Sequence, residues 1–152
     1  MSDQGSRVHK SATSPELANE CERLRAQLNA IAAFAKQGLQ IIAPNGDTLL
    51  MNPAGQRIVG YTPEEHNLPW PERTAVSEKI KADGTSFAVE DLPSRRAMRG
   101  ETVRDVVMGL RRPQGKTVWV LLDAAPIHTA GGEFVGVLLA FSEIAGPSEL
   151  QT

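Results

Sequence analysis

Three apolar segments in the last third of the chain constrain its fold most. Residues 102–111, 116–125 and 134–141 are rich in apolar and β-branched side chains, a composition typical of strands. Turn-forming residues separate them at 113–115 and 131–132. Neighbouring strands joined by short turns pair antiparallel. These segments therefore predict a three-stranded antiparallel unit.

The middle segment is apolar on both faces. Within residues 118–122, Trp119 and Leu121 fall on one face, and the two valines and the remaining leucine fall on the other. A sheet with one wet face would alternate apolar and polar residues. We therefore expect one face to line the interior, and Trp119 or Leu121 to contact a covering helix or a second subunit. Pro126 is expected to break this strand.

Two more strands are predicted in the first half of the chain. Residues 39–42 and 48–51 flank an Asn45-Gly46 turn, a pair that accepts positive φ at low cost. A short helix follows from Asn52-Pro53 to its stop at Gly60.

Further short helices are predicted between these strands and the last three. Thr62 and Glu65 stand at capping-box spacing, and Ser94–Arg99 forms another helix, whereas residues 66–91 look otherwise irregular. This order predicts an α+β domain with a five-stranded antiparallel sheet and short helices on one face.

An amphipathic helix is predicted over residues 15–37, before the first strand in the sequence. Residues 1–14 read as a disordered tail, Ser14-Pro15 as the helix start and Gly38 as its stop. The apolar positions alternate spacings of four and three: Leu17, Cys21, Leu24, Leu28, Ile31 and Ala35. The helix either packs on its own domain or forms a two-chain interface, and we favour a homodimer through this helix.

Composition excludes several classes of function. The formal net charge of −2 gives no overall field for nucleic acid. The apolar runs are far shorter than the ~20 residues of a membrane helix, and the first residues lack a secretory signal. Cys21 is the only cysteine, so no intrachain disulfide forms. We expect a cytoplasmic protein that binds neither nucleic acid nor membrane.

Three blocks of residues resemble the PAS family of sensory domains. The first runs from Ile42 to Glu65 and includes Asn45-Gly46-Asp47 and Gly60-Tyr61. The second runs from Ala82 to Val103 around Leu92-Pro93, and the third from Arg111 to Val137. The resemblance covers residues 38–145, taken as the domain, with 146–152 as a C-terminal tail. It implies a curved sheet that cups a small cavity against helices, as in the PAS domains of bacterial sensor kinases.

The end of the domain departs from the family pattern. Such domains usually close with Asp-Ile-Thr, whereas this chain has Glu143-Ile144-Ala145. Gly146-Pro147 is unsuited to continuing a helix, and no kinase, cyclase or DNA-binding segment is recognisable. If the chain is complete, its output is expected from the N-terminal helix or from a separate signalling protein such as a kinase.

The resemblance and strand parity together predict a ligand cavity, whose small-molecule ligand or cofactor the sequence leaves unknown. Arg95, on the helix that lines the cavity in relatives, suits an acidic group. The expected lining is Ile58, Val59, Trp70, Phe87, Leu92, Arg95, Met98, Met108, Leu110, Val120 and Leu122.

Known cofactor chemistries find little support in the sequence. Haem-binding relatives supply a histidine from the central helix, and residues 92–99 contain none. Photoactive flavin relatives need a cysteine inside the domain, whereas Cys21 precedes it. His9, His66 and His128 lack metal-ligand spacing, and no nucleophile motif occurs.

The sequence therefore favours a signalling role without catalysis. The leading hypothesis is a dimeric sensory module that binds a small ligand or a protein partner. The alternative is a ligand-free scaffold for protein contacts. A small enzyme built on the curved sheet is a more distant alternative, for which Asp105 and Asp123 would be candidate acid–base groups.

Overall fold

A computed structural model describes residues 13–69, 72–73, 75–113 and 115–147. The expected disorder of residues 1–12, the position of Trp70 and the last part of the C-terminal tail lie outside these ranges. The chain divides into two units, with the boundary between Phe34 and Ala35. Among the described residues, no helix combines the length and the apolar character needed to cross a membrane.

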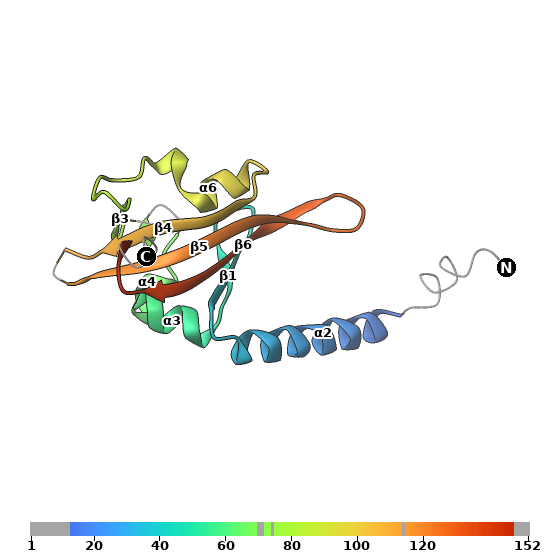
Figure 1. Cartoon of the computed structure of the whole chain (residues 1–152). Coiled ribbons are helices and arrows are strands. Elements are labelled where there is room, and N and C mark those ends of the chain that lie inside the picture. Colours follow the sequence, from blue (N-terminus) through green and yellow to red (C-terminus); the bar gives the residue numbers. More distant parts are fainter. Residues whose placement is uncertain (1–12, 70–71, 74, 114, 148–152) are drawn as a thin grey trace. The chain divides into compact units, whose positions relative to one another are not determined.

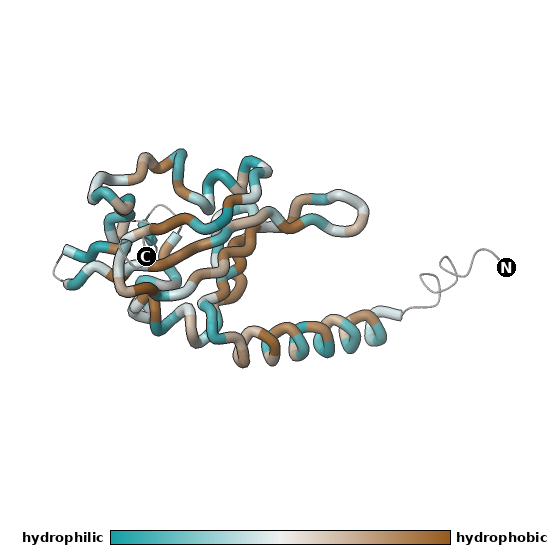
Figure 2. Tube along the Cα trace, viewed as in Figure 1, coloured by the Kyte–Doolittle hydropathy of each residue, from teal (hydrophilic) through white to brown (hydrophobic). Residues whose placement is uncertain are grey.

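The first unit is the helix α2, Ser14–Phe34. Its start differs from the prediction, because Thr13 rather than Ser14 caps it. The Glu16 backbone N–H donates to Thr13 Oγ1 at 3.2 Å, and the Thr13 N–H donates to Glu16 Oε1 at 2.8 Å, which completes a capping box. Apolar and polar residues alternate around the helix (Figure 2). Leu17, Leu24, Leu28 and Ile31 are all exposed.

The second unit is built on one antiparallel sheet (Figure 1). Its strand order is β2-β1-β6-β5-β4-β3. The strands are β1 (Gly38–Ile42), β2 (Thr48–Met51), β3 (Glu78–Ile80), β4 (Val103–Arg111), β5 (Thr117–His128) and β6 (Phe134–Ile144). The helical segments are α3 (Pro53–Val59), α4 (Pro63–His66), η1 (Val89–Asp91) and α6 (Pro93–Met98). The predicted α+β class and antiparallel sheet are confirmed.

The number of strands was predicted one too low. The sixth strand, β3, pairs with β4 at the sheet edge. It lies inside the segment expected to be irregular. Its three residues include two charged ones, Glu78 and Lys79, so it carries too little apolar pattern to be recognised.

The prediction that Pro126 breaks the middle apolar segment is wrong. Pro126 lies within β5 and pairs with Val137 of β6. The pairing of β5 with β4 ends earlier, at Ala124. Beyond that point β5 has an open edge, and an open edge tolerates a residue without an N–H.

The core forms where one face of the sheet meets α3 and α6. Strand alternation places Val120, Leu122 and Ala124 of β5 on this face, and all three are buried. Leu122 lies opposite Phe141, and Ala124 lies opposite Leu139. The buried apolar residues of β1, β4, β5 and β6 form one continuous cluster with Ala97 of α6.

The side chain of Asn52, which lies between β2 and α3, connects α3 to the start of β1. Its Oδ1 accepts hydrogen bonds from the Gly55 N–H at 2.9 Å and from the Leu39 N–H at 2.8 Å. Its Nδ2 donates to the Gln37 carbonyl at 3.0 Å. The predicted helix cap is therefore confirmed, and the same side chain also fixes the start of β1.

Gly38 has a different role from the predicted helix stop. It is the first residue of β1 and lies opposite Phe141. A Cβ here would lie 2.4 Å from Phe141 Cε2 and 2.9 Å from the Gly55 Cα. Only glycine lets α3 and the Phe141 ring approach the strand this closely.

We predict that Gly38→Ala destabilises the domain by about 1–3 kcal/mol, because overpacking forces the Phe141 ring or α3 to move. Urea unfolding measures the change. Gly131→Ala is the matched control, since a Cβ at Gly131 meets only Thr129 Oγ1, at 3.9 Å. Equal stability of the two variants would show that the close approach is not needed.

Candidate functional site

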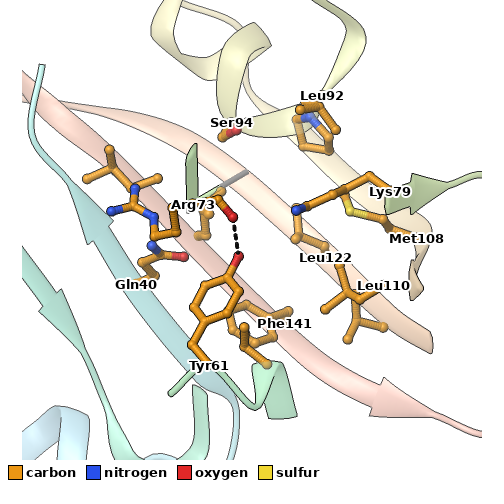
Figure 3. Close-up of a pocket in the computed structure, with 15 residues that line it drawn as sticks. Gln40, Tyr61, Arg73, Lys79, Leu92, Ser94, Met108, Leu110, Leu122 and Phe141 are labelled. Atoms are coloured by element: carbon orange, nitrogen blue, oxygen red, sulfur yellow. Dashed lines mark hydrogen bonds between the residues drawn. The ribbon is translucent and has the colours of Figure 1, made fainter. Parts of the chain in front are cut away.

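A cavity of about 90 Å³ lies between the sheet and the helices α3 and α6. Figure 3 shows the side chains that line it. The strands β1, β3, β4, β5 and β6 all contribute to it. The lining residues are Gln40, Ile42, Val59, Tyr61, Arg73, Lys79, Leu92, Pro93, Ser94, Met108, Leu110, Val120, Leu122, Leu139 and Phe141.

Six of the eleven residues expected at a ligand cavity line this one. They are Val59, Leu92, Met108, Leu110, Val120 and Leu122. Ile58, Phe87 and Met98 are instead partly buried against the core cluster. Arg95 is exposed and does not belong to the lining, because it points away from the helix face that packs on the sheet. Trp70 lies outside the described residues.

The polar part of the cavity was missed by the sequence analysis. It comprises Gln40, Tyr61, Arg73, Lys79 and Ser94. Strand alternation places Lys79 on the face opposite Ile80, and because Ile80 is the apolar residue of β3, the local pattern would have predicted the reverse orientation. Tyr61 belongs to the recognised Gly60-Tyr61 pair. Arg73 lies in a segment without any periodic pattern, and no signal in the sequence would have placed it.

Arg73 is the most deeply placed charged group of the lining, with 4% of its surface exposed. One terminal nitrogen, Nη2, donates to the Gly46 carbonyl at 3.0 Å, and the other, Nη1, lies 3.4 Å from the Leu68 carbonyl. The Tyr61 hydroxyl in turn lies 3.4 Å from the Arg73 carbonyl (Figure 3). Burial lowers the pKa of Arg73, while Tyr61 and Asp47 act in the opposite direction.

Lys79 extends from the edge strand β3 toward the interior of the cavity (Figure 3). Its Nζ donates to the Ser77 carbonyl at 3.0 Å and to Ser77 Oγ at 3.1 Å. Burial, together with the positive charges of Arg112 and Arg73, lowers the pKa of Lys79 to about 8. The cavity therefore combines apolar walls with a concentration of positive charge.

Arg112 contributes to this charge from outside the cavity, where it has a carboxylate partner. Its Nη2 lies 3.2 Å from Glu65 Oε1 and donates to the Gly60 carbonyl at 2.8 Å. The guanidinium also lies over the Tyr61 ring, 5.8 Å from its centre. Glu65 is fixed by the predicted capping box with Thr62, which is confirmed.

The carboxylates considered for acid–base chemistry have a structural role. Asp105 and Asp123 do approach each other, but the contact is a 2.7 Å hydrogen bond from the Asp105 backbone N–H to Asp123 Oδ1. It lies where the register between β4 and β5 shifts, and Asp105 has φ 58 there. Asp123 thus supports a β-bulge.

Other candidate chemistry is also accounted for structurally. His128 packs edge-on against Phe134, with ring centres 5.8 Å apart. In the described ranges, no three His, Cys, Asp or Glu side chains gather to hold a metal ion. Four arginines that follow Arg95 in the sequence form ion pairs at the surface: Arg96 and Arg99 with Glu101, Arg104 with Asp123, and Arg111 with Glu78.

Comparisons with known proteins agree with this architecture. A family model described as the PAS fold matches residues 22–144. No curated protein sequence matches significantly.

Solved structures resemble the chain at low sequence identity. The PAS domain of an HTR-like protein from Haloarcula marismortui is 16% identical, with a TM-score of 0.55, and the match covers 86% of this chain and 99% of that one. A LOV protein from Rhodobacter sphaeroides is 18% identical, with a TM-score of 0.55 and coverage of 81% and 68%. The PAS domain of nitrogen regulation protein NR(II) from Vibrio parahaemolyticus is 12% identical, with a TM-score of 0.54 and coverage of 76% and 96%. These likenesses show the fold.

The lowered pKa of Lys79 predicts how stability depends on pH. Between pH 8 and 9.5 the unfolded chain keeps the proton on Lys79, whereas the folded chain releases it. The free energy of unfolding contributed by this group therefore rises with pH. With the folded pKa at about 8, the rise is about 1–2 kcal/mol over this window.

Lys79→Met should lose this rise, whereas Lys81→Met should keep it, since Lys81 is exposed. Chemical unfolding of the three proteins across the window, without added organic acids, measures the difference. Parallel pH profiles for wild type and Lys79→Met would contradict the prediction.

Proposed function

This chain belongs to the PAS family, and we propose that it is a sensory module that binds a small ligand in its cavity and acts as a homodimer. PAS domains are typically sensory and signalling modules rather than catalysts. The observation that carries the proposal is the cavity, in which an apolar wall meets a few polar groups, as in small-molecule sites generally.

The ligand part of the proposal rests on how the cavity is enclosed. Strands from both halves of the sheet and two helices contribute to the lining, so an occupant would contact several elements of the domain at once. Binding of this kind stabilises the folded state and links ligand concentration to the geometry of the sheet. A signal can then pass to a partner such as a separate kinase.

The dimer part rests on α2. Leu17, Leu24, Leu28 and Ile31 are between 45% and 68% exposed, although they follow the four–three spacing of a packed seam. A row of exposed large apolar side chains on a helix needs a covering surface. A second copy of α2 offers the same seam and would bury both rows.

Native mass spectrometry of the purified protein tests both parts, because it reports the subunit count and any retained small molecule. A dimer that carries a retained molecule supports the sensory proposal. A dimer that retains nothing, and whose melting temperature no metabolite raises, would instead support the ligand-free scaffold for protein contacts.

We predict that Leu28→Asp converts the dimer to monomer. The substitution places a charge in the apolar seam, and burying an unpaired charge is strongly unfavourable. Sedimentation velocity at a fixed protein concentration measures the subunit count. Ala26→Asp is the matched control, because it adds the same charge on the opposite face of the same helix. The interface would lie elsewhere if both variants sedimented like the wild type.

A further inference from the structure

We propose that the cavity takes a compact organic carboxylate, with Arg73 and Lys79 contacting the carboxylate group and the apolar wall enclosing the rest of the molecule. This inference rests on the proposed role of the cavity as a ligand site and adds the chemical class of the ligand.

The first argument is the sign of the charge in the cavity. Its described lining includes two cationic side chains, Arg73 and Lys79, and no aspartate or glutamate. Arg112, just outside, adds a third positive charge that acts on Lys79. Cations gathered in a space of about 90 Å³ repel each other, and an anion between them removes that repulsion.

The second argument is the cost of keeping these cations away from water. Burying a charge is unfavourable unless it is paired and hydrogen-bonded. The lowered pKa of Lys79 shows that the fold disfavours its ammonium form. A carboxylate would favour that form again and would raise this pKa.

The third argument is the contrast between Arg73 and the surface arginines. Arg112 and Arg96 lie exposed or half-buried and pair with Glu65 and Glu101. Arg73 is far more buried, and its described hydrogen bonds reach only backbone carbonyl oxygens, while the charge of Asp47 acts on it without a described hydrogen bond. These bonds hold the guanidinium in place without neutralising it, and guanidinium geometry suits a carboxylate.

The walls of the cavity set the size and the nature of the ligand. Leu110, Leu122 and Phe141 present apolar surface, which favours an organic acid over an inorganic anion. The volume lies well below the roughly 300–1,000 Å³ of sites for drug-sized ligands. Gln40 and the Tyr61 hydroxyl supply further polar contacts for a carboxylate or a second oxygen.

The test is isothermal titration calorimetry of the full chain at pH 7 with pentanoate and benzoate. Pentanamide and benzamide are the uncharged matched probes, and inorganic phosphate is the anion without an apolar body. We expect at least one of the two acids to bind at least tenfold more tightly than its amide and than phosphate. Tighter binding of phosphate than of both acids would overturn the organic part of the proposal.

Lys79→Met and Lys81→Met form the matched pair of variants. Lys81 directly follows β3, is exposed and does not belong to the cavity lining, and its Nζ lies 5.7 Å from the centre of the Phe87 ring. Lys79→Met should weaken binding of the acid about 10- to 100-fold, the usual effect of losing a charge-assisted hydrogen bond. The affinity for the amide should stay unchanged. Lys81→Met should bind both as the wild type does. Arg73→Lys, which keeps the charge, should retain part of the affinity.

The pH dependence gives a second readout. The groups that face Lys79 are Arg73, Tyr61 and Arg112 with its partner Glu65. Burial raises the pKa of Tyr61, and the arginines stay charged, so Lys79 alone changes charge between pH 7 and 9.5. Affinity for the acid should therefore fall across this range in the wild type, and stay flat in Lys79→Met.

The outcomes separate this inference from the proposed function. If the amides bind as tightly as the acids, and Lys79→Met changes neither, the cavity is a ligand site but the carboxylate class is wrong. If no probe binds, the carboxylate proposal is overturned. The retained molecule in native mass spectrometry then decides the ligand part of the proposed function by itself.

Discussion

The carboxamide of Asn52 is the interaction on which the rest of the domain depends. Its oxygen accepts hydrogen bonds from the N–H of Leu39 and from the N–H of Gly55, so the starts of β1 and α3 are fixed by the same side chain. This arrangement brings the helix close enough to touch Gly38 and the Phe141 ring. Because β6 carries Phe141 and lies between β1 and β5, the same clamp fixes where the helical layer meets the middle of the sheet. The cavity is the space left beyond this contact.

Local chemistry made most of this fold predictable. Asn52, Gly60 and the Thr62–Glu65 pair are recognisable caps, and the apolar alternation of β5 placed Val120 and Leu122 on the inner face. The failures have physical causes. Pro126 is tolerated because β4 has already ended beside it, a fact of pairing that no local pattern carries. Gly38 serves close packing against Phe141, more than a hundred residues away in the sequence, rather than the end of a helix.

The cavity was predictable only in its apolar part. Strand parity identifies side chains that point inward, and it identified Met108 and Leu110 for this reason. Arg73 and Lys79 come from the segment between α4 and η1, whose sequence carries little periodic pattern, and they are placed by long-range contacts. Arg73 is held by Gly46, far back in the β1–β2 turn. Arginine on the central helix was expected instead, but Arg95 faces outward, where its neighbours form surface ion pairs.

Arg73 and Lys79, the two cations that line the cavity, are each attached to an edge of the sheet. β2 and β3 are the two edge strands, at opposite ends of the strand order. Arg73 donates to the turn that leads into β2, and Lys79 lies on β3 itself. A ligand that contacts both side chains therefore connects the two edges across the curved face, and edge strands have fewer ladder bonds than central ones to resist movement. Under the proposed function, a charged ligand held by both side chains would link these two edges, and a change in the sheet could follow from its binding.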